Sequence, residues 1–161
     1  MIILGIDPGT TRIGYGIVER DKGKLTRKKS GLLYVPKGLS ENNRLPAIEK
    51  SLRKLLIEQK PDRMCIERLF FAKNQKTAIA VAQARGILIN TAVKQGIEIQ
   101  EQTPLQVKIA VTSSGKASKD AVAIMVRKLL GIPETERLID DITDALAAAI
   151  AGANNNYHDV S

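Results

Sequence analysis

Residues 2–6 form an unbroken apolar run, Ile-Ile-Leu-Gly-Ile, which leads into Asp7 and is followed directly by Pro8 and Gly9. A short apolar run bounded by turn residues predicts a buried β-strand. Asp7 is then the last side chain of that strand, at the carboxyl end where open α/β sheets carry their chemistry. The position of this acid predicts a functional carboxylate rather than a surface charge.

Further acids accompany Asp7. A second apolar run ends in Glu67, and a predicted helix over residues 137–153 carries Asp140, Asp141 and Asp144. Asp141 and Asp144 are three residues apart, whereas Asp140 and Asp144 are four apart, so periodicity leaves both pairs open as neighbours. Acids from three separated segments predict a site for a hard cation such as Mg²⁺ or Mn²⁺. Solvated surface charge is the alternative for each acid alone, and it is strongest for Asp144.

The remaining pattern predicts a single α/β domain. Strands are expected over residues 2–7, 13–18, 25–35, 63–67 and 97–100. Helices are expected from the Ser40 cap to Pro61, from the Asn74 cap to Gly96, from Thr103-Pro104, from the Ser118 cap to Gly131, and over 137–153. This order predicts a five-stranded mixed sheet flanked by helices, as in the ribonuclease H-like fold. We expect a nuclease domain over residues 1–153 and a polar C-terminal tail over residues 154–161.

The helix predicted from Asn74 to Gly96 has little polar surface. Residues 78–82 and 86–89 are almost entirely apolar, and they leave no wide hydrophilic face. A helix that is apolar nearly all round is buried on more than one side. A partner subunit is one candidate for the second cover, and the rest of the same chain is the other.

Composition narrows the function classes. The chain has 161 residues and a formal net charge of +8, which suits a nucleic acid or another polyanion as partner. Its single cysteine, Cys65, excludes an internal disulfide and is expected to be a small buried side chain. Its single histidine, His158, excludes a His-rich zinc or haem site. No apolar stretch reaches transmembrane length and no signal peptide pattern is present, so a soluble cytoplasmic protein is expected.

The two phenylalanines of the chain are adjacent. Phe70 and Phe71 lie shortly after Glu67 and close to Lys73. An aromatic pair in a loop beside a nuclease-type site predicts stacking on an unpaired or distorted base. The alternative is that both rings pack beneath the loop. We expect Phe70 to be exposed and Phe71 to be packed.

A group of lysines surrounds Ser113-Ser114-Gly115, the segment that separates two predicted helices. Its members are Lys108, Lys116 and Lys119. Phosphate contacts are their expected function, because lysine side chains on such a surface bind a nucleic-acid backbone. A merely solvated basic surface is the alternative.

Three blocks of the sequence occur in the order and spacing of a known family. The blocks are Ile3–Thr10 with Gly14-Tyr15-Gly16, then Ile66-Glu67 with Phe70–Asn74 and Gln83–Gly86, and last Asp141–Ala147. With them the chain resembles the RuvC crossover junction endonucleases, the bacterial Holliday junction resolvases, over residues 1 to about 153. It departs from many members at Ile13, at residues 113–115 and at Ala121, which bears on loop flexibility and sequence preference.

The resemblance implies a homodimer that cuts two opposing strands of four-way junction DNA near its crossover. It implies Mg²⁺ as cofactor, with Mn²⁺ as a substitute, in a two-metal site, and products with a 5′-phosphate and a 3′-hydroxyl. Carried over by position, the metal-binding and catalytic acids are Asp7, Glu67, Asp141 and Asp144, which favours Asp141 over Asp140. Phe70 matches an aromatic used at the junction, and Lys108 and Lys119 match basic residues that handle DNA. The branch-migration proteins RuvA and RuvB are the implied partners.

Two other function classes compete with a junction endonuclease. Residues 7–11 resemble the first phosphate loop of actin-like ATPases, but such proteins need a second homologous lobe that a chain of 161 residues does not supply. A non-catalytic nucleic-acid-binding module on the same fold is the second rival. It would gain nothing from four acids facing DNA, so we expect an enzyme.

Overall fold

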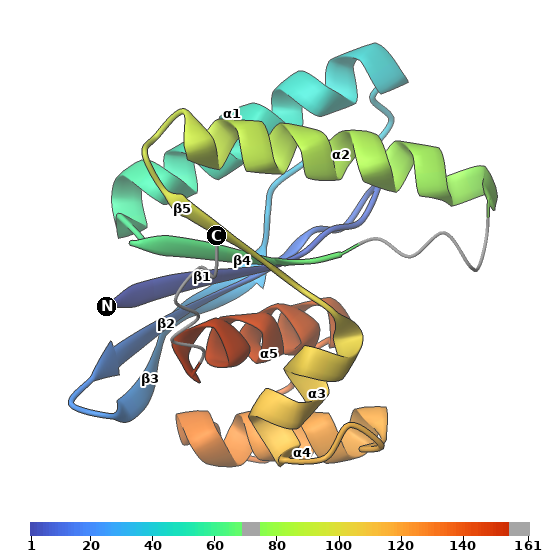
Figure 1. Cartoon of the computed structure of the whole chain (residues 1–161). Coiled ribbons are helices and arrows are strands. Elements are labelled where there is room, and N and C mark those ends of the chain that lie inside the picture. The colour runs from blue at the N-terminus through green and yellow to red at the C-terminus, as the bar shows by residue number, and fades with distance from the viewer. Residues whose placement is uncertain (69–74, 155–161) are drawn as a thin grey trace, which may run out of the picture.

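We describe the fold from a computed structural model, over residues 1–68 and 75–154. In chain order the elements are β1 (Ile2–Asp7), β2 (Gly14–Asp21), β3 (Lys24–Leu32), α1 (Glu41–Gln59), β4 (Arg63–Glu67), α2 (Gln75–Val93), β5 (Glu98–Gln102), α3 (Pro104–Thr112), α4 (Lys119–Leu130) and α5 (Asp140–Asn154). They form three layers, with α1 and α2 on one face of the sheet and α5, α3 and α4 on the other (Figure 1). The predicted five-stranded sheet flanked by helices is confirmed.

The sheet is mixed, and β1 lies at its centre. The strand order is β3-β2-β1-β4-β5. β1 pairs antiparallel with β2, which pairs antiparallel with β3, whereas β4 runs parallel to β1 and β5 runs parallel to β4. The carboxyl ends of β1, β4 and β5 therefore meet at one edge of the sheet, where α5 also begins (Figure 1).

The sheet separates two hydrophobic cores, because successive side chains of a strand point to opposite faces. On β1, Leu4 and Ile6 pack into a cluster with side chains of α1 and α2 such as Leu52 and Leu88. Ile3 joins the opposite cluster, which contains Ile150 of α5. Buried on both faces, β1 is a continuous apolar run rather than an alternating one.

Three strands differ from the prediction in their boundaries. β2 was expected over residues 13–18 but spans Gly14–Asp21, and it pairs with β3 along that length. β3 was expected to reach Val35 but ends at Leu32. Leu33 still donates a backbone hydrogen bond to Ile13, but Pro36 follows closely and has no N–H to extend the ladder. β5 lies over Glu98–Gln102 instead of residues 97–100, because it follows the parallel register of β4.

Two helix boundaries also differ. α2 ends at Val93 rather than at Gly96. A tight turn follows, in which the Gly96 N–H donates a hydrogen bond to the Val93 carbonyl oxygen, and Gly96 itself has a positive φ. α5 begins at Asp140 rather than at residue 137, because the first helical hydrogen bonds are accepted by Ile139.

α2 is buried on one side only. Ala84 and Leu88 are buried in the core shared with α1, whereas Ile79 and Val93 are 69% and 56% exposed. Residues 1–68 and 75–154 therefore leave these two side chains on the outer face of the helix uncovered. Within residues 1–68 and 75–154, the structure contains no helix with the length and apolar character needed to cross a membrane.

Candidate active site

The register of the central strands places two acids side by side. Gly5 of β1 pairs with Cys65 of β4 in parallel register, and Asp7 and Glu67 follow two residues further along these strands. Side chains two residues apart point to the same face, so both acids share the face of Gly5 and Cys65. That face is covered by α5, because α5 lies directly against Gly5. The prediction that both acids end buried strands is confirmed.

Glycines allow α5 to approach this face closely. A Cβ atom added to Gly5 would lie 1.9 Å from the carbonyl oxygen of Ala145, and one added to Gly14 would lie 1.9 Å from that of Asp141. Gly14 is the register partner of Asp7 in the antiparallel ladder between β1 and β2. The first turn of α5 therefore lies beside Asp7 because no side chain intervenes.

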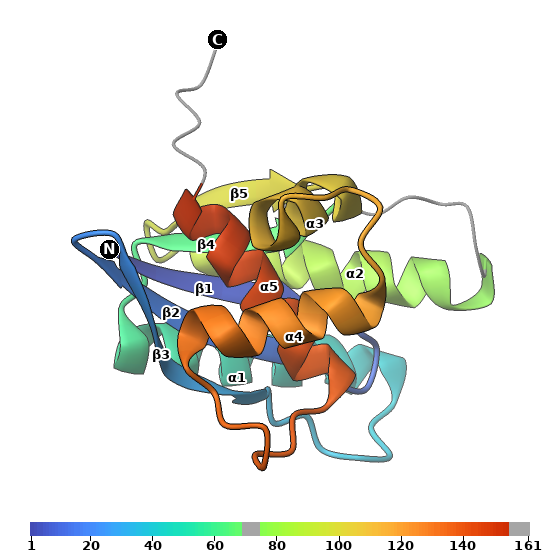
Figure 2. The same cartoon turned by 90° about the horizontal axis from the view of Figure 1, so that it is seen from below.

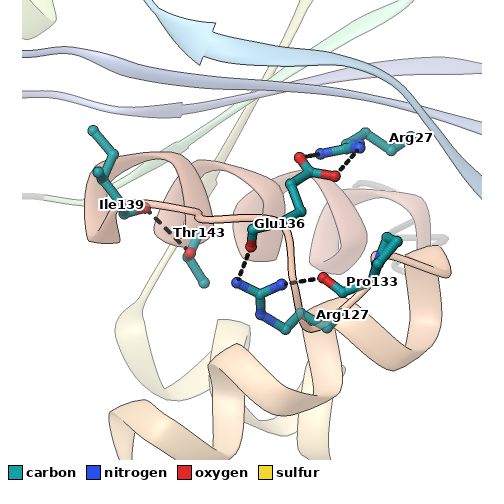
Figure 3. A network of polar contacts seen from close by, with 6 residues as sticks. All are labelled: Arg27, Arg127, Pro133, Glu136, Ile139 and Thr143. Carbon is teal, nitrogen blue, oxygen red and sulfur yellow. Dashed lines mark hydrogen bonds and ion pairs between the residues drawn. The ribbon is translucent and has the colours of Figure 1, made fainter.

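The start of α5 is anchored from several directions. The carbonyl oxygen of Ile139 accepts hydrogen bonds from the backbone of Ile142 and Thr143 and from the Thr143 hydroxyl. In the preceding segment, Glu136 accepts two hydrogen bonds from Arg27 of β3, and its carbonyl oxygen accepts one from Arg127 of α4 (Figure 3). The bond from Arg27 lowers the pKa of Glu136. These contacts fix the segment from which the helix acids emerge.

An open pocket of about 310 Å³ lies between the sheet edge, α3, α4 and α5. Its lining residues are Ile6, Asp7, Glu67, Pro104, Val107, Lys108, Lys119, Val122, Asp144, Ala147 and Ala148. Three predicted acids and two predicted lysines thus meet in one pocket, from five different elements. The small side chains of Ala147 and Ala148 leave room beside Asp144.

The strand acids are strongly perturbed. Burial, together with the negative charges of Asp144, Asp141 and Glu67, raises the pKa of Asp7 to about 7. Loss of water also raises the pKa of Glu67, with a second contribution from Asp144, although part of that side chain stays open to solvent. Carboxylates that are buried away from water and repel one another are stabilised by a bound cation.

The helix acids have cationic partners. The Lys119 ammonium lies 3.2 Å from a carboxylate oxygen of Asp144 and 3.2 Å from one of Asp140. The Arg12 guanidinium lies 3.3 Å from Oδ2 of Asp141, a buried oxygen that accepts no hydrogen bond in the described part of the chain. Partial burial raises the pKa of Asp144, against the lowering effect of Lys119.

The structure distinguishes Asp140 from Asp141, which helical periodicity alone could not do. The side chain of Asp140 is 81% exposed, whereas that of Asp141 is 20% exposed. Asp141 also contributes to the raised pKa of Asp7, and Asp140 is not among the causes. Asp141 is therefore the helix acid of the first turn that faces the strand acids.

A hard divalent cation fits the chemistry of these donors. Within the described ranges, no set of three or more acids, cysteines or histidines is arranged to hold a metal ion. The donors are nonetheless all carboxylate oxygens, which Mg²⁺ prefers, and burial and the three neighbouring carboxylates raise the pKa of Asp7, as expected where a cation is favoured. Lys119 already places one positive charge beside Asp140 and Asp144.

The other predicted contact residues are only partly brought to the site. Lys108 and Lys119 line the pocket, whereas Lys116 is exposed in the turn before α4 and does not line it. Phe70, Phe71 and Lys73, with the Asn74 cap, lie outside the described residues. The Lys76 side chain is also outside them.

Two arginines that the sequence reasoning did not single out belong to the site. Arg12 pairs with Asp141, and its place in the turn between Asp7 and Gly14 was the available signal. Arg85 of α2 donates through Nε to the carbonyl oxygen of Glu67, at 3.1 Å, and pairs with Glu101 at 2.9 Å. It therefore ties the end of β4 to α2 and β5.

Comparison with known proteins agrees with this geometry. The family model described as crossover junction endodeoxyribonuclease RuvC matches residues 3–152. Proteins of that name from Syntrophomonas wolfei and Moorella thermoacetica are 45% and 44% identical, over 93% and 96% of this chain and 87% and 92% of theirs. The structure of Thermus thermophilus RuvC in complex with a Holliday junction substrate superposes with a TM-score of 0.87 at 30% identity, over 96% of this chain and 93% of that one.

These matches extend over nearly the whole chain and include every element that forms the pocket. The superposition also confirms the predicted ribonuclease H-like architecture. The chain belongs to the RuvC family of crossover junction endodeoxyribonucleases.

Proposed function

We propose that this protein resolves four-way (Holliday) DNA junctions in recombination and repair, by paired symmetric nicks near the crossover. It is a metal-dependent endonuclease that hydrolyses phosphodiester bonds. The observation that carries the proposal is the pocket in which Asp7, Glu67 and Asp144 meet Lys108 and Lys119, in a chain of the RuvC family. Acids that hold cations and lysines that hold phosphates are the two requirements of such a reaction.

Asp7, Glu67, Asp141 and Asp144 are the proposed metal-binding and catalytic residues, and two Mg²⁺ ions, replaceable by Mn²⁺, are the proposed cofactor. When bound, the ions supply Lewis-acid activation of the attacking water and neutralise charge on the phosphate. Asp7 would be central to holding the ions, because it lies on the central strand and the charges of the other three acids raise its pKa.

The chain's own residues position the substrate for in-line attack. Water forms a new bond to phosphorus, the bond from phosphorus to the 3′ oxygen breaks, and that oxygen takes a proton to give a 3′-hydroxyl and a 5′-phosphate. Lys108 and Lys119 line the pocket and hold the non-bridging phosphate oxygens. The Lys119 ammonium has three N–H donors and contacts two carboxylates, Asp140 and Asp144, so one donor is left for a phosphate oxygen.

Further DNA contacts are proposed from the sequence. Phe70 or Phe71 stacks on a base at the crossover, with Lys73 beside it, and Lys116 binds the backbone next to the pocket. Because Lys116 is exposed and does not line the pocket, its contact is to a phosphate away from the cut.

The proposed assembly is a homodimer that uses α2. Symmetric nicks in two strands need two sites, and the exposed Ile79 and Val93 form an uncovered apolar face suited to a second copy. We also propose a nuclease domain over residues 1–153 with a polar tail over 154–161. RuvA and RuvB as partners and a cytoplasmic location complete the proposal.

A cleavage assay tests the function directly. Purified protein is incubated with a synthetic mobile four-way junction or a linear duplex of the same sequence, with Mg²⁺ or with EDTA. We expect paired nicks at symmetric positions in the junction alone, and only with Mg²⁺. Tight binding to the mobile junction without any cleavage would instead establish a non-catalytic junction-binding module, and cutting of the duplex at equal rate would remove the structure specificity.

A further inference from the structure

A second cavity lies beside Arg12, the residue whose guanidinium pairs with Asp141. It has a volume of about 340 Å³, and its lining residues are Thr11, Arg12, Val35, Pro36, Lys37, Gly38, Leu39 and Arg44. These residues come from the turn after β1, from the segment between β3 and α1, and from the first turns of α1. The cavity is therefore built where three connections meet rather than inside a core.

The lining carries three cations and no acid. Arg12, Lys37 and Arg44 contribute the charges, and the other five lining residues are uncharged. Arg44 is half-buried and donates a hydrogen bond to the Leu39 carbonyl oxygen, which fixes its side chain at the wall. Lys37 is exposed. Arg12 pairs with Asp141, whereas no ion pair within the described residues involves Lys37 or Arg44. Three cations that converge on one cavity, two of them without an acidic partner among those residues, form a site for an anion.

Arg12 joins this cavity to the acid pocket. Its guanidinium pairs with Asp141, and the same side chain lines the cavity. A guanidinium has five N–H donors, so it can hold a carboxylate on one side and an anion on the other. Both views place the turn after β1 and the chain leading into α1 at the end of the sheet where α5 begins (Figures 1 and 2).

We propose that Arg12, Lys37 and Arg44 form a phosphate-binding subsite that holds a backbone phosphate of the DNA strand within a few nucleotides of the cut. The inference rests on the proposed function for the identity of the ligand. A phosphodiester fits because it is a compact anion with several acceptor oxygens, which suits arginine and lysine donors. The lining has no aromatic side chain on which a base could stack, which favours the backbone over a nucleobase.

The subsite separates positioning from chemistry. A phosphate held here would contact Arg12, which also pairs with Asp141. The subsite therefore fixes the register of the strand before its scissile phosphate enters the acid pocket. Contacts of this kind are independent of sequence and strengthen binding at low salt. The residues of the subsite are therefore expected to affect junction binding and not the preferred cut sequence.

Substitution at Lys37 and Arg44 tests the subsite without touching Arg12 or any acid. Lys37→Gln, Arg44→Gln and the double variant are compared with Lys50→Gln, an exposed lysine of α1 that does not line the cavity. Arg44→Lys keeps the charge and serves as the conservative variant. Junction affinity is measured in EDTA over a series of salt concentrations, and thermal unfolding confirms that each variant is folded.

Each lost contact is expected to reduce the slope of log affinity against log salt by about one, and to weaken binding roughly three- to tenfold near 0.1 M salt. Lys50→Gln and Arg44→Lys are expected to keep the slope of the unchanged protein. Phosphate ethylation interference locates the contact: one or two phosphates near the cut that interfere with binding of the unchanged protein no longer interfere with the double variant.

Unchanged slope and unchanged interference in the double variant would overturn the subsite. So would an equal loss in Lys50→Gln, because the effect would then be one of net charge. These outcomes are distinct from failure of the proposed function, in which the unchanged protein itself neither prefers nor cuts the junction. Binding of inorganic phosphate, followed by chemical-shift changes of the Arg12 side chain that the double variant no longer shows, supports the anion site independently of DNA.

Discussion

The four acids of the site fall into two pairs that the fold treats differently. Asp7 and Glu67 end β1 and β4, and among the described residues no ion pair reaches either carboxylate. Asp141 and Asp144 lie on α5, and each has a cationic partner, Arg12 and Lys119 respectively. The strand acids are held by backbone ladders, whereas the helix acids are held by side-chain ion pairs.

The difference shows where the site needs a cation. The pKa of Asp7 is raised to about 7, because its carboxylate is buried and lies near three other carboxylates without a salt bridge of its own. The helix acids are already partly neutralised, so they gain less from an added charge. A strained site of this kind lowers the stability of the metal-free protein in exchange for affinity for the ion.

Replacing Asp7 is expected to have the largest effect on activity. Asp7→Asn removes the carboxylate at which the charges of the other acids converge, and we expect cleavage to fall by about 10³-fold or more while junction binding persists. Asp21→Asn, an exposed residue at the far end of β2, is the matched control and should cut normally. Cleavage and binding are measured on the same junction; loss of both would give Asp7 a structural role instead.

Moving the helix acids away from the strand acids is expected to have the next largest effect. In Gly5→Ala, the new Cβ would lie 1.9 Å from the Ala145 carbonyl oxygen, so α5 must shift. We expect a loss of about 1–3 kcal/mol in unfolding free energy, measured by denaturant titration, together with slower cleavage. Lys50→Ala is the control, because this exposed residue of α1 can be replaced with little change in stability. Equal stability of the two variants would contradict the close approach of α5.

The pH dependence of stability sharpens the comparison at Asp7. Its pKa is about 7 in the folded protein and near 3.8 when unfolded, so the folded state binds more protons between these values. Metal-free stability therefore falls as pH rises from 4 to 7, and the penalty is complete above 7. Asp7→Asn removes this penalty and should melt a few degrees above the unchanged protein at pH 8, where about 1 kcal/mol corresponds to roughly 2–4 °C.

Thermal unfolding in EDTA at several pH values measures this gap. It should be widest at pH 8 and close toward pH 4, and Asp21→Asn should show no gap at any pH. Added Mg²⁺ should stabilise the unchanged protein at pH 8 and have little effect on Asp7→Asn. A gap that does not change with pH would remove Asp7 as its source.

The strand acids were predictable from the sequence, and the helix acids only in part. Asp7 and Glu67 follow apolar runs, and once β1 and β4 are parallel neighbours their proximity follows from the register. Asp140 and Asp141 share the first turn of α5 and differ by 100° around its axis. Only tertiary contacts distinguish them: Asp141 is largely buried beside Arg12, whereas Asp140 is exposed and pairs with Lys119.

The supporting residues were the least predictable. Arg12 lies in a turn, where no periodicity indicates the direction of a side chain, and its partner is far away in sequence. The end of β3 and the cavity beside it depend on where Pro36 and Gly38 direct the chain toward α1. Patterns of apolar residues predict which elements form, whereas loops that place charged side chains depend on contacts between distant segments.

The smallest expected effect concerns Arg85, which positions a strand acid without touching substrate. It donates to the Glu67 carbonyl oxygen and pairs with Glu101, so Arg85→Gln should loosen the end of β4 and slow cleavage about threefold, less than 1 kcal/mol in the barrier. Single-turnover rates on saturating junction should fall, while junction affinity and its salt dependence stay unchanged. Arg68→Gln, which removes an exposed partner of the same Glu101, is the control and should cut at the normal rate. If Arg85→Gln instead weakened binding and reduced the salt slope, Arg85 would be a DNA contact, and the strand acids would rely on the backbone ladder alone.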